Sequence, residues 1–479
     1  MIFRRQPPQH PDAAPAADAA SSAPAGSVAA DPRSLNRQIL ALAVPAFGAL
    51  IAEPLFVLAD TSIVGHLGTP QLAGLAAASQ VVTTVVGLMV FLSYSTTPAV
   101  ARAYGRGDLA GAYRKGGDGL WTAAGLGVVL AVLGWSFARP LLAAVGAHGP
   151  TLEHAVAYLR WSMPGLPAML VVLAALGILR GLQDTRTPLY VAAVGAAANV
   201  GINWVLVYPL GMGIAGSALG TSLVQWGMAA VYLVMIVGGA RRHGVALTTT
   251  PRRLGAILSV GSWLMLRTLS MRIAILATVV VATRQGEANL AAYQLTMSVF
   301  SFLAFGLDAL AIAAQAMLGK EMGARDLRRA QDRAQVRRLM GRLIRWSLDF
   351  GVVTGLLCPL IGWVLGPAFT QDPQVRGLFL LAMLVVAAGQ PLAAYVFILD
   401  GVLIGAEDVR YLAVASLIAL LGYLPGLLAV GWAAGPSGTG AGPDPAGFVW
   451  LWAAYAGLFM GLRGLTLGLR ARRDVWIRT

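Results

Sequence analysis

Long apolar stretches, separated by short segments that hold charged residues, glycine or proline, recur along the chain after residue 38. A helix needs roughly 20 apolar residues to cross the ~30 Å hydrocarbon core of a bilayer, and each stretch has about that length. The pattern predicts an all-α integral membrane protein with twelve transmembrane helices. We expect these helices near residues 39–64, 73–101, 120–146, 155–179, 187–209 and 214–238, and then near 255–283, 290–318, 343–366, 377–404, 411–432 and 447–469.

Composition and charge agree with a bilayer as the surroundings of most of the chain. Hydrophobic residues make up 57% and charged residues 12% of the 479 residues, whereas a soluble protein has about a quarter charged residues. The net charge of +14 stands in short segments between spans rather than in a basic domain, which excludes a nucleic-acid partner. Such segments mark cytoplasmic loops that face anionic lipid, so we expect both termini in the cytoplasm. The basic residues cluster after the second, sixth and eighth spans, at Arg102, Arg106, Arg114, Lys115, Arg241, Arg242, Arg252, Arg253, Lys320, Arg325, Arg328, Arg329, Arg333, Arg337, Arg338 and Arg342.

The two halves of the chain share an internal repeat. Gly105-Arg106-Gly107-Asp108-Leu109 recurs 218 positions later as Gly323-Ala324-Arg325-Asp326-Leu327, and Leu58-Ala59 recurs at the same separation as Leu276-Ala277. Gly181, Asp184 and Arg186 likewise correspond to Gly405, Asp408 and Arg410 at a separation of 224. Each repeat carries six spans, and an even number returns the chain to the same side of the membrane. The repeat therefore predicts two six-helix lobes related by a pseudo-two-fold axis along the membrane normal, an arrangement suited to alternating access.

These observations divide the chain into five parts. The segment before the first span is rich in Ala, Pro, Ser and Asp, which is typical of a disordered tail. We expect a cytoplasmic tail at 1–34, an N-lobe at 35–240, an inter-lobe cytoplasmic loop at 241–254, a C-lobe at 255–470 and a second cytoplasmic tail at 471–479.

Enzyme chemistry finds little support in the sequence. All five histidines fall in the tail or in loops, and the single cysteine, Cys358, lies in an apolar run. No nucleophile–base arrangement and no phosphate-binding loop is present. We therefore expect no enzyme and no cofactor, and keep a membrane-embedded enzyme as the alternative of a different class.

Carboxylates within the predicted spans are the candidate functional groups of the first half, because a buried ionisable residue in a membrane is expensive to maintain. Asp60 lies in the first span, and Glu53 lies two helical turns earlier on nearly the same face. A carboxylate at that depth can bind and release a proton or coordinate Na⁺. Asn199 and Asn203, four residues apart in the fifth span, share a face at a similar depth. A helix-end role for Asp60, and helix–helix contacts for the two asparagines, remain the structural alternatives.

The second half carries charges of both signs within its spans. Arg267 in the seventh span and Asp308 in the eighth lie at similar depth, which predicts a structural ion pair between them. Asp400 lies near the inner end of the tenth span, where it would mark the inner rim.

Pro45 and Pro54 interrupt the first span on the cytoplasmic side of Asp60. Proline removes a backbone hydrogen bond and favours a kink. A helix that bends beside a titratable carboxylate would make a conformational switch, although membrane helices also tolerate proline without such a role.

These residues stand in stretches that resemble the multidrug and toxic compound extrusion (MATE) family, specifically its DinF-like branch. The resemblance covers residues 36–470. The matching stretches are Ala43–Pro45, Asp60–Gly68, Arg180–Pro188, Gly213–Thr221, Leu266–Leu269, Asp308 with Gln315, and Asp400–Gly401.

The resemblance implies a monomeric antiporter of the cell (inner) membrane. Such a protein exports amphipathic, often cationic, small organic compounds against an inward H⁺ or Na⁺ gradient. Asp60 matches the coupling aspartate of the family, Pro45 the proline at which the first span bends, and Asn199 the asparagine of the fifth span. Where many members have an aspartate four residues later, this chain has Asn203. That departure places coupling more heavily on Asp60, assisted by Glu53, and leaves Na⁺ binding at Asp60, Asn199 and Asn203 as the alternative to proton coupling.

A flippase for lipid-linked precursors, from the wider superfamily, is the rival interpretation. Such a site needs several cations in a central cavity to hold pyrophosphate. Arg267 and Arg272 could serve, but we expect no intramembrane arginine in the first half to complement them.

Overall fold

The computed structural model of the chain describes residues 32–433 and 445–477, apart from the side chains of residues 32, 33 and 53. Its contacts divide it into a short unit that ends at Gln38 and a main unit that begins at Ile39. Most of the cytoplasmic tail predicted at 1–34, and the end of the second tail, lie outside the described residues.

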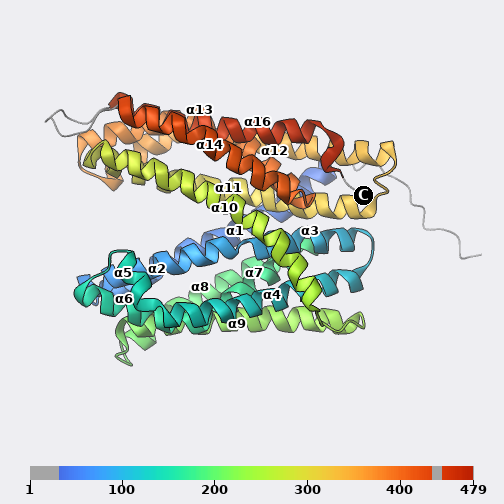
Figure 1. Cartoon of the computed structure of the whole chain (residues 1–479), viewed down its shortest axis with the longest axis horizontal. Helices are drawn as coiled ribbons and strands as arrows, with labels where there is room; N and C mark the ends of the chain where they lie inside the picture. The colour runs from blue at the N-terminus through green and yellow to red at the C-terminus, as the bar shows by residue number, and fades with distance from the viewer. Residues whose placement is uncertain (1–31, 434–444, 478–479) are drawn as a thin grey trace, which may run out of the picture. The chain divides into compact units, whose positions relative to one another are not determined.

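The described residues are almost entirely helical, which confirms the predicted all-α class (Figure 1). The first half contains α1 (Pro32–Gly65), α2 (Thr69–Met89), α3 (Phe91–Gly105), α4 (Leu109–Ser136), α5 (Ala138–Ala144), α6 (Gly149–Ser162), α7 (Leu166–Gly181), α8 (Arg186–Val207) and α9 (Gly213–Arg242). The second half contains α10 (Pro251–Arg284), α11 (Glu287–Ala324), α12 (Ala330–Phe369), α13 (Pro373–Gly405), α14 (Val409–Ala433), α15 (Pro445–Ala453) and α16 (Met460–Arg472).

Twelve segments in the described part of the chain are long and apolar enough to cross a membrane, as the sequence predicts. Three of them join consecutive helices: α2 with α3, α6 with α7, and α15 with α16. A short π-helical stretch, Ala454–Phe459, links α15 to α16.

Several helix ends differ from the predicted ranges, two of them at the third span and at the loop between the lobes. The third span was expected at 120–146, but α4 begins at Leu109 and ends at Ser136, and the apolar residues that follow form the separate helix α5. The loop between the lobes was expected at 241–254, but the structure leaves only residues 243–250 between α9 and α10. In both cases charged residues extend a helix beyond its apolar part, because long basic side chains reach the headgroup region while their stems cover the helix.

The helices of the main unit pack mostly within their own half. In the first half α4 and α3 pack on α7, α8 packs on α9 and α2 packs on α6. In the second half α12 and α11 pack on α13, and α10 packs on α14. Figure 1 shows these two sets, coloured blue to green and yellow to red.

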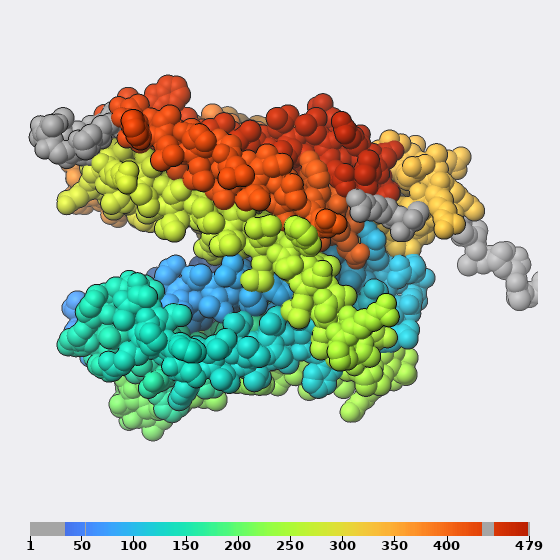
Figure 2. All heavy atoms as spheres, in the orientation of Figure 1, coloured from blue at the N-terminus to red at the C-terminus, as the bar shows by residue number. Residues whose placement is uncertain are grey.

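A crossing of α3 with α11 joins the two halves. A Cβ atom on Gly105 would lie 2.0 Å from the carbonyl oxygen of Lys320, and a Cβ on Gly323 would lie 2.1 Å from that of Arg102. Gly105 and Gly323 correspond in the internal repeat, so each half contributes the same glycine to the contact. Towards the α5–α6 end of the first half, the space-filling view shows a hollow between the two sets of helices (Figure 2).

Candidate functional site

Asp60 lies five residues before the end of α1, with only 7% of its surface exposed. Three side chains from three other helices donate hydrogen bonds to its carboxylate. Tyr158 Oη of α6 and Thr221 Oγ1 of α9 reach Oδ2 at 3.2 and 3.3 Å, and Asn203 Nδ2 of α8 reaches Oδ1. Because the donors come from α6, α8 and α9, the carboxylate ties α1 to the rest of the first half.

Asn199 and Asn203 belong to the same network. Asn199 Nδ2 donates to Thr221 Oγ1 at 2.9 Å, and Asn203 Nδ2 also lies 3.3 Å from Asn199 Oδ1. Both asparagines are fully buried. The structure thus brings together Asp60, Asn199 and Asn203, the three residues that the sequence singled out, through the helical spacing of the two asparagines.

The other amide atom of Asn203, Oδ1, is buried without a hydrogen-bond partner among the described residues. It points at Gly220, where a Cβ atom would lie only 2.0 Å away. A side chain at position 220 would therefore displace Asn203. Gly220 precedes Thr221 on α9. One short segment therefore supplies the Thr221 donor to Asp60 and, at Gly220, leaves space for the amide of Asn203.

The sequence interpretation did not identify Tyr158 or Thr221 as part of this site. Thr221 stands in a stretch that resembles the MATE family, which could have pointed to it. Tyr158 sits on α6 with no local pattern to distinguish it from a packing residue.

The structure adds little on the remaining first-half candidates. Glu53 lies in α1, but its side chain is outside the described residues. Pro45 and Pro54 both lie inside α1, which continues through them as one helix.

Asp60 faces a cavity of about 270 Å³ that is lined by residues of both halves. Its walls are mainly aliphatic and aromatic, with Phe56, Met169 and Tyr94 among them. The charged residues on the lining are Asp60, Asp308 and Arg180. Arg180, in α7, is 7% exposed and donates to Ser93 Oγ at 3.2 Å. The expectation that the first half lacks an intramembrane arginine is therefore wrong; the sequence placed Arg180 at the end of its span, but the helix holds it inside.

The ion pair predicted between Arg267 and Asp308 is not present among the described residues. Arg267 Nη2 instead lies 2.6 Å from Asp400 Oδ2, and Arg463 Nη2 bonds to the same oxygen. Similar depth along two helices is not sufficient for a pair, because the side chains must also face one another. Asp308 is left on the cavity wall.

The sequence predicts that Asp400 marks the inner rim, but the structure buries its side chain. It is 5% exposed and lies between two arginines that are themselves 7% and 2% exposed. The sequence interpretation did not single out Arg463, although it lies within the predicted twelfth span at 447–469. Gln315, the remaining candidate, is buried in α11, where Gly405 of α13 packs closely on its backbone.

No group of three or more histidine, cysteine, aspartate or glutamate side chains occurs in the described part of the chain that could hold a metal ion. Asn203 turns its amide nitrogen toward Asp60, so the oxygens near that carboxylate are the hydroxyls of Tyr158 and Thr221 and, one hydrogen bond further away, Oδ1 of Asn199. These are hard ligands of the kind that an alkali cation accepts.

Curated relatives are similar to this chain in sequence, and solved structures share its fold. The DNA damage-inducible protein F of Escherichia coli is 28% identical over 445 residues, covering 92% of this chain and 93% of its own length. The multidrug resistance protein MdtK of Edwardsiella ictaluri is 25% identical over 409 residues, covering 82% of this chain and 87% of its own. The crystal structure of the Vibrio cholerae MATE transporter VcmN in the bent form matches with a TM-score of 0.82 at 18% identity, covering 93% of this chain and 99% of that one.

The model of the MatE family matches residues 45–205 and 264–426, one stretch in each half. Together these stretches cover more than half of the chain. The chain therefore belongs to the MatE family, whose members are membrane transporters and not enzymes.

Proposed function

We propose that this transporter is an antiporter that exports amphipathic, often cationic organic compounds, driven by an inward proton gradient through Asp60. The observation that carries the proposal is the carboxylate of Asp60 on the wall of the cavity between the halves, hydrogen-bonded by one amide NH2 that donates and by two hydroxyls that can donate or accept. The names of relatives such as multidrug resistance protein MdtK support the substrate class.

The ring of groups around Asp60 suits both protonation states. An ionised carboxylate only accepts hydrogen bonds, and the donors from Tyr158, Asn203 and Thr221 satisfy it. A protonated carboxyl must donate one bond, and hydroxyl groups can rotate to accept it. The free Oδ1 of Asn203 offers a further acceptor if the amide turns over. Proton binding then rearranges the contacts between α1 and the other helices, which links the proton to helix movement.

The cavity itself favours an organic cation. Two carboxylates, Asp60 and Asp308, face one arginine, Arg180, on an otherwise apolar and aromatic lining. Aromatic faces attract cations, and an apolar wall accepts rings and chains of varied shape. Release of a proton from Asp60 leaves a negatively charged carboxylate that a cationic substrate can neutralise. Binding of a proton to this carboxylate then displaces the substrate.

A precursor flippase is less compatible with this charge distribution. A pyrophosphate needs unpaired cations in the cavity, whereas Arg267 and Arg463 share Asp400 and only Arg180 is part of the lining.

The positive loops support our proposal that both termini and the α3–α4 turn lie in the cytoplasm. On that orientation the crossing of α3 and α11 closes the cytoplasmic side, and the hollow near α5 and α6 opens outward. We propose that the protein works as a monomer in the cell membrane, because one chain supplies both halves of the cavity.

The experiment is a transport assay with purified protein in liposomes, run with a proton gradient and a Na⁺ gradient separately, across a panel of organic cations. We expect proton-driven efflux that is lost in Asp60→Asn while the protein remains folded. Asp349→Asn, which neutralises an exposed carboxylate of α12, is the matched control and should transport normally. Wild-type rates from the Asp60→Asn protein under the proton gradient would refute the coupling role of Asp60. Efflux driven by the Na⁺ gradient alone would show that the coupling ion at this site is Na⁺ and not a proton.

A further inference from the structure

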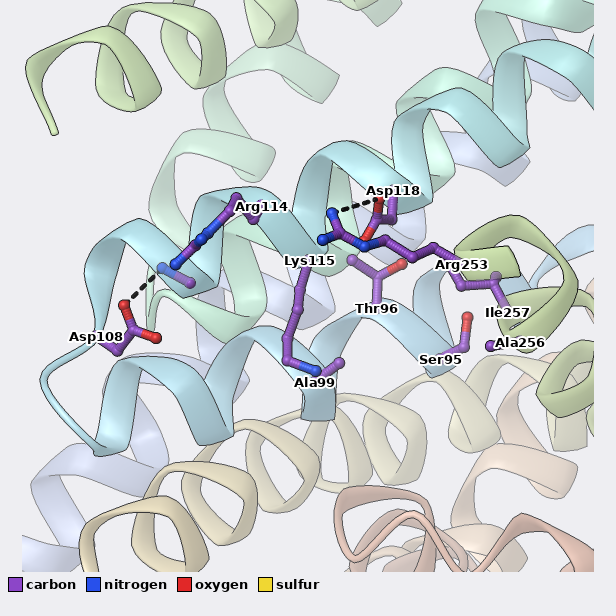
Figure 3. A pocket seen from close by; sticks show the side chains of 11 residues that line it. Ser95, Thr96, Ala99, Asp108, Arg114, Lys115, Asp118, Arg253, Ala256 and Ile257 are labelled. Carbon is purple, nitrogen blue, oxygen red and sulfur yellow. Dashed lines mark hydrogen bonds and ion pairs between the residues drawn. The ribbon is translucent and has the colours of Figure 1, made fainter. Parts of the chain in front are cut away.

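A second cavity, of about 420 Å³, lies between α3, α4 and α10, and shares no lining residue with the cavity at Asp60 (Figure 3). α3 and α4 belong to the first half, whereas α10 is the first helix of the second half. Lys115 crosses the cavity from α4 towards Ala99 of α3, and the guanidinium of Arg253 approaches Asp118 from α10 (Figure 3).

Three cationic side chains line this cavity; Arg114 and Lys115 are exposed, and only Arg253 has a counter-ion, Asp118, among the described residues. Arg114 and Lys115 form no ion pair with any described residue, and Arg253 lies 3.9 Å from Asp118 with half of its side chain exposed. Unpaired guanidinium and ammonium groups that converge on one cavity are the usual recognition chemistry of a phosphate group.

Asp118 is a buried carboxylate on the lining with an oxygen that lacks a hydrogen-bond donor among the described residues. It is 9% exposed, and its Oδ1 atom is buried without a hydrogen-bond partner in the described part of the chain. The 3.9 Å separation from Arg253 is too long for a hydrogen bond. A buried carboxylate oxygen with no donor is costly, which indicates that a donor belongs there.

Asp108, the second carboxylate of the lining, already accepts a hydrogen bond. Asp108 caps α4 by accepting a hydrogen bond from the backbone nitrogen of Gly111 at 2.7 Å. A ligand therefore meets cations at Lys115, Arg114 and Arg253 and one available carboxylate at Asp118.

We propose that this cavity binds a headgroup that carries both a phosphate and a primary ammonium, with the phosphate on Lys115 and Arg253 and the ammonium on Asp118. A phosphatidylethanolamine-type lipid is one source of this chemistry, and soluble phosphoethanolamine is the other. Ala99, Ala256 and Ile257 supply an apolar side to the cavity, against which the glycerol end of a lipid can lie.

Such a ligand would bridge the two halves. Lys115 and Asp118 stand on α4 and Arg253 stands on α10, so a bound headgroup stabilises the arrangement in which these helices approach one another. A ligand that binds one conformation better raises the population of that conformation.

The test is native mass spectrometry of the full-length purified protein with dioleoyl phosphatidylethanolamine, phosphatidylglycerol or phosphatidylcholine. We expect one retained phosphatidylethanolamine, bound several-fold better than the other two, because phosphatidylglycerol lacks the ammonium and phosphatidylcholine cannot donate from it. Lys115→Gln combined with Arg253→Gln should weaken binding on the order of tenfold. Asp118→Asn should bring phosphatidylethanolamine down to the level of phosphatidylglycerol. Arg241→Gln, an exposed cation at the end of α9 outside this cavity, is the control and should bind as wild type.

Competition with soluble phosphoethanolamine separates the sources. Displacement of the lipid at millimolar concentration shows that the headgroup alone is recognised, and failure to displace it assigns the site to the lipid; both results support the proposed chemistry. Equal binding of all three lipids by the wild-type protein would overturn the proposal. So would an unchanged lipid preference in Asp118→Asn, or an unchanged phosphatidylethanolamine affinity in the Lys115→Gln, Arg253→Gln double variant, each verified as folded by its thermal melt.

Discussion

Gln183 and Glu407 adopt the same left-handed backbone conformation, with φ of 67° and 61°, at corresponding positions of the two halves. Among the described residues they are the only ones other than glycine with positive φ. Each follows the end of a helix and reaches the opposite half: Gln183 Nε2 donates to the carbonyl of Ala316 at 2.9 Å, and a Glu407 carboxylate oxygen lies 3.8 Å from Arg102. Glycine would suit the backbone better at both positions, and of the two contacts with the opposite half only that of Gln183 is a hydrogen bond.

Glu407→Gly should stabilise the protein by roughly 1 kcal/mol, because it removes the left-handed strain. The lost contact is long and partly exposed and contributes little, and Arg102 keeps its 2.8 Å hydrogen bond to the carbonyl of Ala406. The measurement is thermal unfolding in detergent, with Glu407→Ala as the control that removes the side chain but keeps the strain. Equal melting temperatures for the glycine and alanine variants would contradict the prediction.

Gly105→Ala should loosen the crossing of α3 and α11. Its Cβ would meet the carbonyl oxygen of Lys320 at 2.0 Å, and backbone atoms cannot rotate away. Overpacking of this kind typically costs about 1–3 kcal/mol, and hydrogen exchange should rise in the contacting turns of both helices. Gly125→Ala in α4, where nothing lies within 4 Å of the added atom, is the matched control and should exchange as wild type. Unchanged protection of α11 in Gly105→Ala would show that the crossing is not a tight contact.

The spans and the cluster at Asp60 could be predicted because each depends on a local sequence pattern: the length of an apolar stretch or the spacing of residues within one helix. Apolar length defines a span, and the four-residue spacing of Asn199 and Asn203 places both amides on one helix face. The sequence also put these two amides at a depth similar to that of Asp60, and the family resemblance marked Asp60 and Asn199 as site residues.

The second-half ion cluster could not be predicted in the same way. Arg267 was paired with Asp308 on depth alone, but depth does not tell which way a side chain faces around its helix. Asp400 and Arg463 lie 63 positions apart on helices whose contact no local pattern reveals. The left-handed backbone at Gln183 and Glu407 was equally hidden, since neither residue type favours that conformation.

Asp400→Asn should destabilise the protein by about 3–5 kcal/mol, because it leaves the buried Arg267 and Arg463 without their shared carboxylate. Arg463→Met should cost less, since one arginine and Asp400 remain paired. Glu153→Gln is the control: Arg139 and Glu153 also lie 2.6 Å apart, but both are more than half exposed. That surface pair should be worth less than about 1 kcal/mol. Similar losses of thermal stability in Asp400→Asn and Glu153→Gln would show that the buried cluster is not a structural element.

Tyr158→Phe should reduce gradient-driven efflux roughly fivefold. The ionised carboxylate of Asp60 loses one hydrogen-bond donor and with it about 1 kcal/mol of stabilisation, so release of the proton becomes less favourable. Tyr208→Phe offers a matched control. Its hydroxyl also bonds to α1, but at the backbone carbonyl of Ile63, 2.8 Å away, and not at the carboxylate. Both variants remove one oxygen that anchors α1, so a merely structural role for Tyr158 predicts equal effects on efflux and on the melting temperature. The coupling role predicts that only Tyr158→Phe changes the dependence of efflux on the pH gradient, with Tyr208→Phe retaining the wild-type profile.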